Sequence, residues 1–369
     1  MKKAVFSFFT MRTSGDYSWW DDFPIAIGKC LKEKGIDHIC FYRGYSDKSR
    51  YPKDIQNILL HKDIQNPFKV KQIVAPYAKR YDKVIFHHQT PSFLSGLWVF
   101  NRKFNRRYSW ITTEHDSWSS TEFSSSKRLI RSVLRGMGFL PNIIIGCSRA
   151  SDNRITNLYG SKGVGFIYNG INLQNIPEPK PLNDMPTKVL FVGRLEEYKG
   201  LWPLVNAFRT LEKTDNTKLT IVGNGPLYKS LSDFIAQHDL GKRIVMMGHS
   251  YNISELMLKH DFIVIPSTYE ENCPITSLEA QAHYLPCIYS NSGGLPETQI
   301  QGKTGIMIEK NNPDAIINAI KYFQEDISRF NQMRLDARTN SLNFSINKMA
   351  EKYCELYLKV FNDENIASI

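Results

Sequence analysis

Short apolar runs alternate with amphipathic stretches along the first half of the chain. A stretch with helical periodicity covers residues 19–34 and stops at Gly35, a residue that commonly follows helices. Uninterrupted apolar runs are typical of strands buried on both faces, and strands that alternate with helices form parallel sheets. The region 43–76 shows no clear pattern. We therefore predict a first doubly wound α/β domain over residues 1–172, with strands at 3–10, 39–42, 83–88, 110–116, 142–148 and 165–168.

The pattern breaks at residues 173–187, where prolines interrupt a polar run. Prolines in a polar stretch are typical of a linker between domains. A second alternating series follows and predicts another doubly wound domain over residues 188–345. A last amphipathic helix is predicted at 346–361. Within the second series we expect strands at 188–194, 218–222, 244–247, 262–265 and 287–289, and helices at 201–211, 253–260 and 313–323.

Polar and glycine-rich residues gather after the apolar runs of the stretch 261–294. In an open parallel sheet, ligands bind at the carboxyl edge of the strands. Glu271 is expected in a loop, and Glu279 about two turns into the following helix. Backbone N–H groups at the start of that helix could bind an anion. Taken alone, the same pattern is also typical of an acidic first turn followed by one surface glutamate.

Two further motifs follow strands of the second series. Gly193 and Arg194 end one strand and Lys199 lies five residues after Arg194, so a guanidinium and an ammonium group could hold a diphosphate from two sides. A solvated loop with surface salt bridges is the alternative. The glycines of residues 223–226 follow the next strand, where they could admit a ligand to the backbone or simply make a tight turn.

In their order and spacing, these motifs resemble the donor-binding domain of the retaining group 1 (family 4) glycosyltransferases, which have the GT-B fold. The resemblance is strong over residues 188–308. It implies two Rossmann-like domains facing across a cleft, the first binding the acceptor and the second a nucleotide sugar, with a C-terminal helix (346–369) returning to the first domain. The segments that carry it are 192–194 with 199–200, 222–226, 266–267 with Glu271, 279–280 and 292–297, and more weakly Gly15, His115 and 169–170.

The resemblance also implies roles for individual residues. Arg194 and Lys199 would bind the donor diphosphate, and Glu279 the ribose hydroxyls. Glu271 and His115 would face the donor sugar and the reacting centre, although a buried structural histidine is the alternative for His115. These residues, apart from Glu279, form the predicted catalytic set. The predicted donor-binding set adds Gly15, Gly193, Gly223, Met247, Asn272, Cys273, Pro274 and Ile275 to Arg194, Lys199, Glu271 and Glu279.

Two departures from the family's pattern fall on these residues. Residues 272–274 read Asn-Cys-Pro where many members have Gly-Phe-Gly, and residues 14–16 read Ser-Gly-Asp in place of a double glycine. The chemistry needs fixed positive charge where the leaving diphosphate develops negative charge. Because Arg194 and Lys199 would supply it, we expect no metal and no cofactor besides the nucleotide diphosphate sugar, which is the donor substrate.

Charge and cysteine content bear on the location of the protein. The net charge is +11 over 369 residues, with basic clusters at 102–107 and 127–135. Apolar residues interleave with the second cluster, a pattern typical either of an amphipathic helix on an anionic membrane surface or of an ordinary solvated helix. The six cysteines have no C-x-x-C spacing, which favours a reducing compartment. No run of 18 apolar residues occurs, so no transmembrane helix is expected.

Together these observations predict a cytoplasmic retaining glycosyltransferase, peripheral on the inner face of the cytoplasmic membrane. It would transfer a hexose to a saccharide acceptor during synthesis of a bacterial surface polysaccharide such as lipopolysaccharide. We expect this acceptor to be lipid-linked. A nucleotide-sugar epimerase of the same fold and a non-catalytic partner-binding subunit are the alternatives. A nicotinamide oxidoreductase is disfavoured because no G-x-G-x-x-G follows the first strand, and no motif for nucleic-acid binding occurs.

Overall fold

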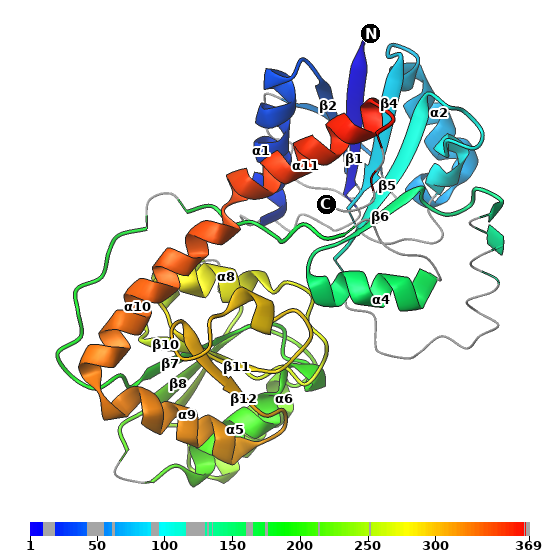
Figure 1. Cartoon of the computed structure of the whole chain (residues 1–369). Coiled ribbons are helices and arrows are strands. Elements are labelled where there is room, and N and C mark those ends of the chain that lie inside the picture. Colours follow the sequence, from blue (N-terminus) through cyan, green and yellow to red (C-terminus); the bar gives the residue numbers. More distant parts are fainter. Residues whose placement is uncertain are drawn as a thin grey trace. The chain divides into compact units, whose positions relative to one another are not determined.

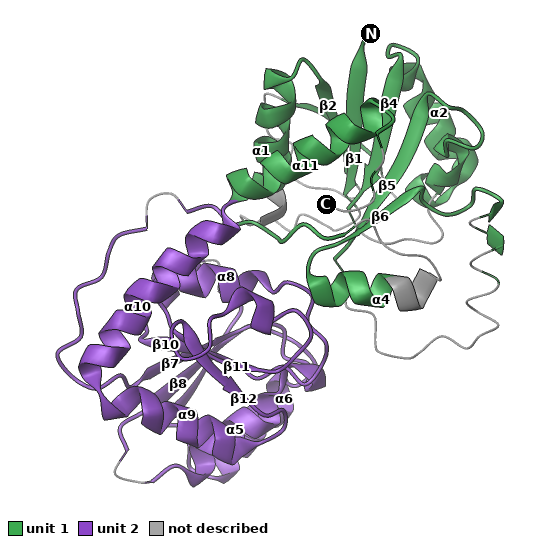
Figure 2. Ribbon diagram, viewed as in Figure 1, with its two compact units in different colours: residues 1–170, 346–369 green, residues 171–345 purple. Residues whose placement is uncertain are grey.

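The structure is a computed structural model in which the chain forms two compact units, residues 1–170 with 346–369 and residues 171–345 (Figure 2). Both units are layered α/β structures, which confirms the predicted fold class (Figure 1). The residues that the structure describes are 1–9, 19–42, 55–60, 63–89, 96–115, 130, 133–134, 136–159, 165–173, 176–212, 215–250, 252–364 and 366.

The described strands of unit 1 form one parallel sheet in the order β3-β2-β1-β4-β5-β6. The chain builds this sheet outward from β1 in one direction and then from β4 in the other. The boundary between β1 and β4 is therefore the topological switch point, where such sheets bind ligands. The strands are β1 (Lys3–Phe9), β2 (Asp37–Tyr42), β3 (Gln56–Leu59), β4 (Lys83–His88), β5 (Tyr108–Glu114) and β6 (Ile143–Gly146).

Helices cover both faces of this sheet (Figure 1). Alternate residues of β1 point to opposite faces, so Val5 packs with α1 (Trp19–Glu33) and α11 (Ile346–Phe361), whereas Phe6 packs with α2 (Pro67–Ala78). The last element of unit 1 in the sequence therefore lies beside its first helix. Unit 1 also contains α4 (Arg149–Tyr159), η2 (Asp63–Gln65) and η3 (Gly96–Phe100).

Unit 2 repeats the strand order of unit 1. Its described strands are all parallel, in the order β12-β11-β10-β7-β8-β9, so its switch point lies between β7 and β10. The continuous apolar run of β10 reflects burial on both faces of the sheet, whereas alternate residues of the edge strand β9 are exposed. The strands are β7 (Lys188–Val192), β8 (Lys218–Val222), β9 (Ile244–Gly248), β10 (Phe262–Ile265), β11 (Cys287–Ser290) and β12 (Gly305–Ile308).

The helices of unit 2 also lie on both faces of its sheet. One face packs with α5 (Leu201–Thr210), α6 (Tyr228–Gln237) and α9 (Pro313–Glu325). The other packs with α7 (Ile253–Lys259) and α8 (Ile275–Ala282). Connecting or terminal elements are η4 (Glu197–Lys199), η5 (Pro296–Thr298), α10 (Ile327–Ser341) and η6 (Leu342–Phe344).

Several elements differ from the sequence prediction. The region 43–76, which showed no clear pattern, contains β3 and α2, and helix α10 was missed entirely. The strand predicted at 165–168 is wrong, since its backbone makes only a single bridge, between Gly146 and Phe166. The segment predicted as a linker is held on unit 2, where Leu182 N donates to Asn331 Oδ1 (2.9 Å) and Arg334 donates to the Lys180 carbonyl (3.0 Å).

Two features bear on the predicted location. All six cysteines are free thiols, Cys30 being half-buried and the others buried. Within the described ranges, no helix is both long enough and apolar enough to cross a membrane.

Candidate active site

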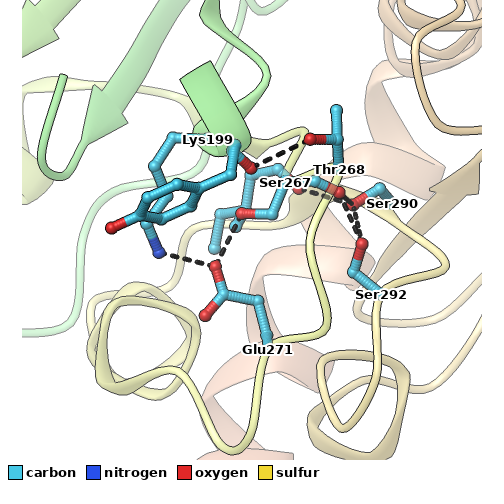
Figure 3. A network of polar contacts seen from close by, with 8 residues as sticks. Lys199, Ser267, Thr268, Glu271, Ser290 and Ser292 are labelled. Atoms are coloured by element: carbon cyan, nitrogen blue, oxygen red, sulfur yellow. Dashed lines mark hydrogen bonds and ion pairs between the residues drawn. The ribbon is translucent and has the colours of Figure 1, made fainter. Parts of the chain in front are cut away.

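Two predicted site residues of unit 2, Lys199 and Glu271, meet at its switch point. Arg194 and Lys199 follow β7, and Glu271 follows β10, the strand paired with β7. Because both strands end at the same edge of the sheet, residues that lie 72 positions apart in the sequence become neighbours (Figure 3).

An ion pair between Lys199 and Glu271 is the centre of this site (Figure 3). Lys199 Nζ lies 2.6 Å from Glu271 Oε1, and the two side chains are 23% and 9% exposed. The same carboxylate oxygen accepts a 2.6 Å hydrogen bond from Ser267 Oγ. Glu271 therefore has two donors on one oxygen, and the ammonium group remains accessible to an anion.

The end of β11 and the residues after it hold the loop that carries Glu271. The hydroxyls of Ser290 and Ser292 both donate to the Ser267 carbonyl, Ser290 at 2.6 Å (Figure 3). Gly294 N donates to the Glu271 carbonyl at 2.7 Å. Gly293 has a φ of 53°, and a β-carbon there would lie 2.2 Å from the Glu271 carbonyl oxygen. Only glycine allows this close approach.

Lys199 is held from its own side of the site. Both the backbone N–H and the hydroxyl of Thr268 donate to the Tyr198 carbonyl, at 2.9 and 3.2 Å. These bonds tie the short helix η4 to the loop after β10. The backbones that carry Lys199 and Glu271 are therefore fixed to each other independently of the ion pair.

The structure places other predicted residues less centrally. The Arg194 side chain is 73% exposed and pairs with Glu196, not with Glu271. Gly223 has a φ of 143°, and a β-carbon there would lie 1.8 Å from the Gly193 carbonyl, so the close neighbour of Gly223 is the chain's own backbone. Met247 lies on the edge strand β9 and is 47% exposed.

Glu279 is the fifth residue of α8, just over one turn from the helix start rather than about two turns. Burial raises the pKa of its carboxyl group from the usual range to about 7. No other described side chain pairs with this carboxylate. The N-cap position of α8 is Pro274, which gives no side-chain cap, so the first N–H groups of α8, from Ile275 onward, are not capped by that side chain.

Asn272, next to Glu271, is a buried polar residue without a partner. It is 4% exposed, and neither its amide oxygen nor its amide nitrogen has a hydrogen-bond partner within the described residues. An unpaired buried polar group costs about 1–3 kcal/mol. Such a group fits a site that is completed by a ligand hydroxyl. Cys273, the next residue, is 4% exposed.

In unit 1, His115 lies just beyond the end of β5. Its Nε2 lies 3.3 Å from Gln89 Oε1, and Gln89 Nε2 lies 3.1 Å from His87 Nδ1. His87 in turn contacts Tyr357 OH of α11 at 2.6 Å and Thr113 Oγ1 at 2.8 Å. Burial lowers the pKa of His115 to about 3, so its imidazole is neutral at physiological pH.

Other predictions lie partly or wholly outside the described residues. Gly15 is one of them, and so is most of the basic stretch 127–135. The roles of these residues stay predictions.

The sequence reasoning gave no role to the three serines that brace Glu271 or to Gln89. Ser267 and Ser292 belong to the motifs that carry the resemblance, and all three serines are almost fully buried. In the sequence, the available signal for these serines was a hydroxyl residue at or just after the end of a buried strand. Among the described residues, no cluster of three or more His, Cys, Asp or Glu side chains could hold a metal ion.

Comparison with known proteins gives a family match for most of unit 2. Residues 173–340 match the family described as "Glycosyl transferases group 1", and they contain the whole Lys199–Glu271 site. These residues, a little under half of the chain, therefore resemble a group 1 glycosyltransferase domain. The resemblance predicted from the motifs is therefore confirmed.

Named relatives agree with this match, and solved structures share the fold. Glycogen synthase from Mycobacterium tuberculosis is 29% identical over 66% of this chain and 60% of its own length. A UDP-Gal:α-D-GlcNAc-diphosphoundecaprenol α-1,3-galactosyltransferase from Escherichia coli is 29% identical over 53% of this chain and 54% of its own. The chain thus matches little more than half of these relatives. A glycosyltransferase from Rickettsia africae shares the fold, with a TM-score of 0.81, 22% identity and coverage of 98% and 100% of the two chains.

Proposed function

We propose that this group 1 glycosyltransferase moves a hexosyl group from a nucleotide diphosphate sugar to a saccharide hydroxyl, with retention of the anomeric configuration. The observation that carries the proposal is the Lys199–Glu271 ion pair at the switch point, inside the residues that match the family. An accessible ammonium group held beside a carboxylate provides one charge for a diphosphate and one acceptor for sugar hydroxyls.

In the proposed reaction, the bond between the sugar C1 and the phosphate oxygen breaks, and the diphosphate leaves with the electron pair. The acceptor hydroxyl oxygen bonds to C1 from the same face, and its proton passes to the leaving phosphate oxygen. Lys199, with the exposed side chain of Arg194, offsets the charge that develops on the diphosphate. Glu279 binds the ribose hydroxyls, and its raised pKa lets it accept or donate near neutral pH. We expect this chemistry to need no metal ion, so activity should persist in EDTA.

The acceptor proposed is a lipid-linked saccharide of a bacterial surface polysaccharide. The Escherichia coli relative is named for a diphosphoundecaprenol-linked acceptor, and this chain carries a net charge of +11 that suits an anionic membrane surface. On unit 1, Phe104, Val133 and Met137 are 53–54% exposed, and Lys103 donates to the Gly136 carbonyl beside them. We propose a cytoplasmic enzyme that binds the inner membrane face through this patch.

Vesicle binding tests the membrane part. Vesicles with anionic phosphatidylglycerol should sediment the protein at low salt and neutral phosphatidylcholine vesicles should not. Met137→Ser with Val133→Ser should weaken the binding. Protein that stays in the supernatant with both vesicles would contradict the membrane proposal without affecting the donor site.

A donor screen tests the transfer reaction. Purified protein is titrated with UDP-, GDP- and ADP-sugars beside Lys199→Met and Glu279→Gln, and turnover is followed with and without a saccharide acceptor. Lys310→Met is the matched control, because Lys310 and Glu270 form a similar pair (2.8 Å, 28% and 38% exposed) in the same region. We expect one nucleotide sugar to bind, both site variants to lose it and the control to keep it.

The same screen separates the alternatives. An epimerase would convert its nucleotide sugar without any acceptor. A non-catalytic subunit would bind none of the sugars, or would bind them equally well in the variants. Either result would overturn the proposed transfer reaction.

A further inference from the structure

We propose that Ser267 is a positioning residue that keeps Glu271 paired while Lys199 transfers from Glu271 to the donor diphosphate. This inference rests on the proposed function. It adds an account of how Lys199 can exchange Glu271 for the diphosphate as its ion-pair partner. Ser290 and Ser292 support Ser267 by fixing its carbonyl (Figure 3).

The argument starts from the donors around the Glu271 carboxylate. Its Oε1 accepts from Lys199 Nζ and from Ser267 Oγ, both at 2.6 Å. With only 9% of the side chain exposed, water cannot readily replace a donor that leaves. Removing a partner from a buried charged group is more costly than removing one from an exposed group. If Lys199 left and Ser267 were absent, Oε1 would lose both of the donors that the described residues give it.

A diphosphate must take Lys199 away from this carboxylate, at least in part. The lysine side chain is 23% exposed, so an anion can reach the ammonium group. The peptide that carries Lys199 cannot move far, because Thr268 holds the Tyr198 carbonyl through two hydrogen bonds. Transfer of the ammonium group is therefore a side-chain rotation, and Glu271 keeps its place.

Ser267 is suited to remain as the donor during that rotation. Its side chain is 1% exposed, and its carbonyl accepts from both Ser290 and Ser292, whose hydroxyls are themselves buried. These bonds orient the Ser267 peptide, and Glu271 is the acceptor that the Ser267 hydroxyl has in the structure. Gly294 N holds the Glu271 carbonyl at 2.7 Å, so the carboxylate stays within reach of Ser267.

This arrangement predicts opposite signs for two substitutions. Ser267→Ala leaves Glu271 Oε1 without a donor from the described residues once Lys199 moves, so nucleoside diphosphate should bind about tenfold more weakly. Glu271→Gln removes the competing charge from Lys199, so the diphosphate should bind about fivefold more tightly while glycosyl transfer is lost. A loop that merely loses order would weaken binding in both variants.

The test is titration calorimetry of the whole chain with UDP, GDP and ADP, for the parent, both single variants and the double variant Ser267→Ala/Glu271→Gln. A neutral amide needs no compensating donor, so Ser267→Ala should have no effect in the Glu271→Gln background. Ser292→Ala should weaken binding in the same direction as Ser267→Ala, by a smaller factor. Ser267→Thr, which keeps the hydroxyl, should bind like the parent.

Ser341→Ala is the control for loss of a buried serine hydroxyl in unit 2, since Ser341 is fully buried and donates to the Arg338 carbonyl at 2.6 Å. It should bind diphosphate like the parent. Additive effects of Ser267 and Glu271, or unchanged binding in both Ser267→Ala and Ser292→Ala, would overturn the inference. If the parent bound none of the three nucleotides, the proposed function would fall and this inference with it.

Discussion

His87 and Tyr357 lie 270 positions apart in the sequence, yet the tyrosine hydroxyl lies 2.6 Å from the histidine Nδ1. His87 is fully buried in the core of unit 1. Tyr357, its hydrogen-bond partner, belongs to α11. On its other side, His87 Nε2 contacts Thr113, which also contacts Tyr353 OH at 3.0 Å. The C-terminal helix is thus joined to the sheet by polar contacts as well as by apolar packing.

Removing the Tyr357 hydroxyl should destabilise unit 1. Tyr357→Phe leaves His87 Nδ1 with Gln89 as its remaining donor, so the free energy of unfolding should fall by about 1–2 kcal/mol. Urea unfolding followed by circular dichroism measures the change. Tyr228→Phe on the surface of unit 2 is the control and should unfold like the parent. An equal loss in both variants would contradict the role of the buried hydroxyl.

Gln89 should affect catalysis through His115. In the structure, Gln89 Oε1 accepts from His115 Nε2 while its amide group donates to His87, which fixes the proton of His115 on Nε2. Gln89→Met should lower kcat about tenfold by releasing the imidazole. The affinity for nucleoside diphosphate should not change. A kcat equal to that of the parent would show that His115 has no catalytic role or needs no orientation.

A methyl group at Gly293 should damage the site, whereas the same change at Gly302 should not. Both glycines have positive φ values, 53° and 76°, but only at Gly293 would the β-carbon meet backbone, 2.2 Å from the Glu271 carbonyl. Gly302→Ala should cost about 1 kcal/mol of backbone strain. Gly293→Ala should suffer the same strain and also lose the hydrogen bond from Gly294 N to the Glu271 carbonyl. Its free energy of unfolding should therefore fall by about 2–3 kcal/mol in all. Thermal unfolding compares the two, and equal losses would contradict the close approach.

Glu279 should destabilise the donor-free protein at high pH. Burial raises the pKa of its carboxyl group from near 4.5 to about 7, so the folded protein binds this proton more tightly than the unfolded chain. The stability that the proton gives is present below pH 4.5 and is lost as the pH rises through 7. Glu279→Gln should therefore stabilise the protein by about 2 kcal/mol at pH 8 and by much less at pH 5.

Denaturant unfolding at the two pH values measures this difference. Glu255→Gln is the control of opposite sign, because Lys259 lowers the pKa of the exposed Glu255 carboxyl and the substitution removes that pair. A gain for Glu279→Gln that did not depend on pH would show that desolvation of the charge is not its cause.

Most of both sheets could be predicted because the strands are buried on both faces. Runs such as residues 262–265 are entirely apolar and end at proline or glycine, so their type and position follow from the sequence alone. Helix α10 was missed because its buried face is partly polar: Arg334 and Asn340 are each 8% exposed and form hydrogen bonds to other segments. Only tertiary contacts show that such residues lie inside.

The candidate site was predictable to the level of its residue types. Lys199 and Glu271 each follow a strand that borders the switch point, so their proximity follows from strand order. The pairing of Arg194 with Glu196 could not be foreseen, because an exposed arginine has several nearby acceptors. The roles of Ser267 and Ser292 depend on the acceptor to which each hydroxyl donates. The positions of those acceptors are set by the tertiary structure and cannot be read from the sequence.

The place of α11 in the fold has a consequence for synthesis on the ribosome. Phe23 of α1 packs edge-to-face on Tyr353 of α11. The apolar core around α1 is therefore incomplete until residues 346–361 have left the ribosome. Unit 2, residues 171–345, is translated entirely before that point. We therefore expect the later unit to mature first during translation, while the nascent earlier unit waits with an exposed apolar surface on which chaperones can act.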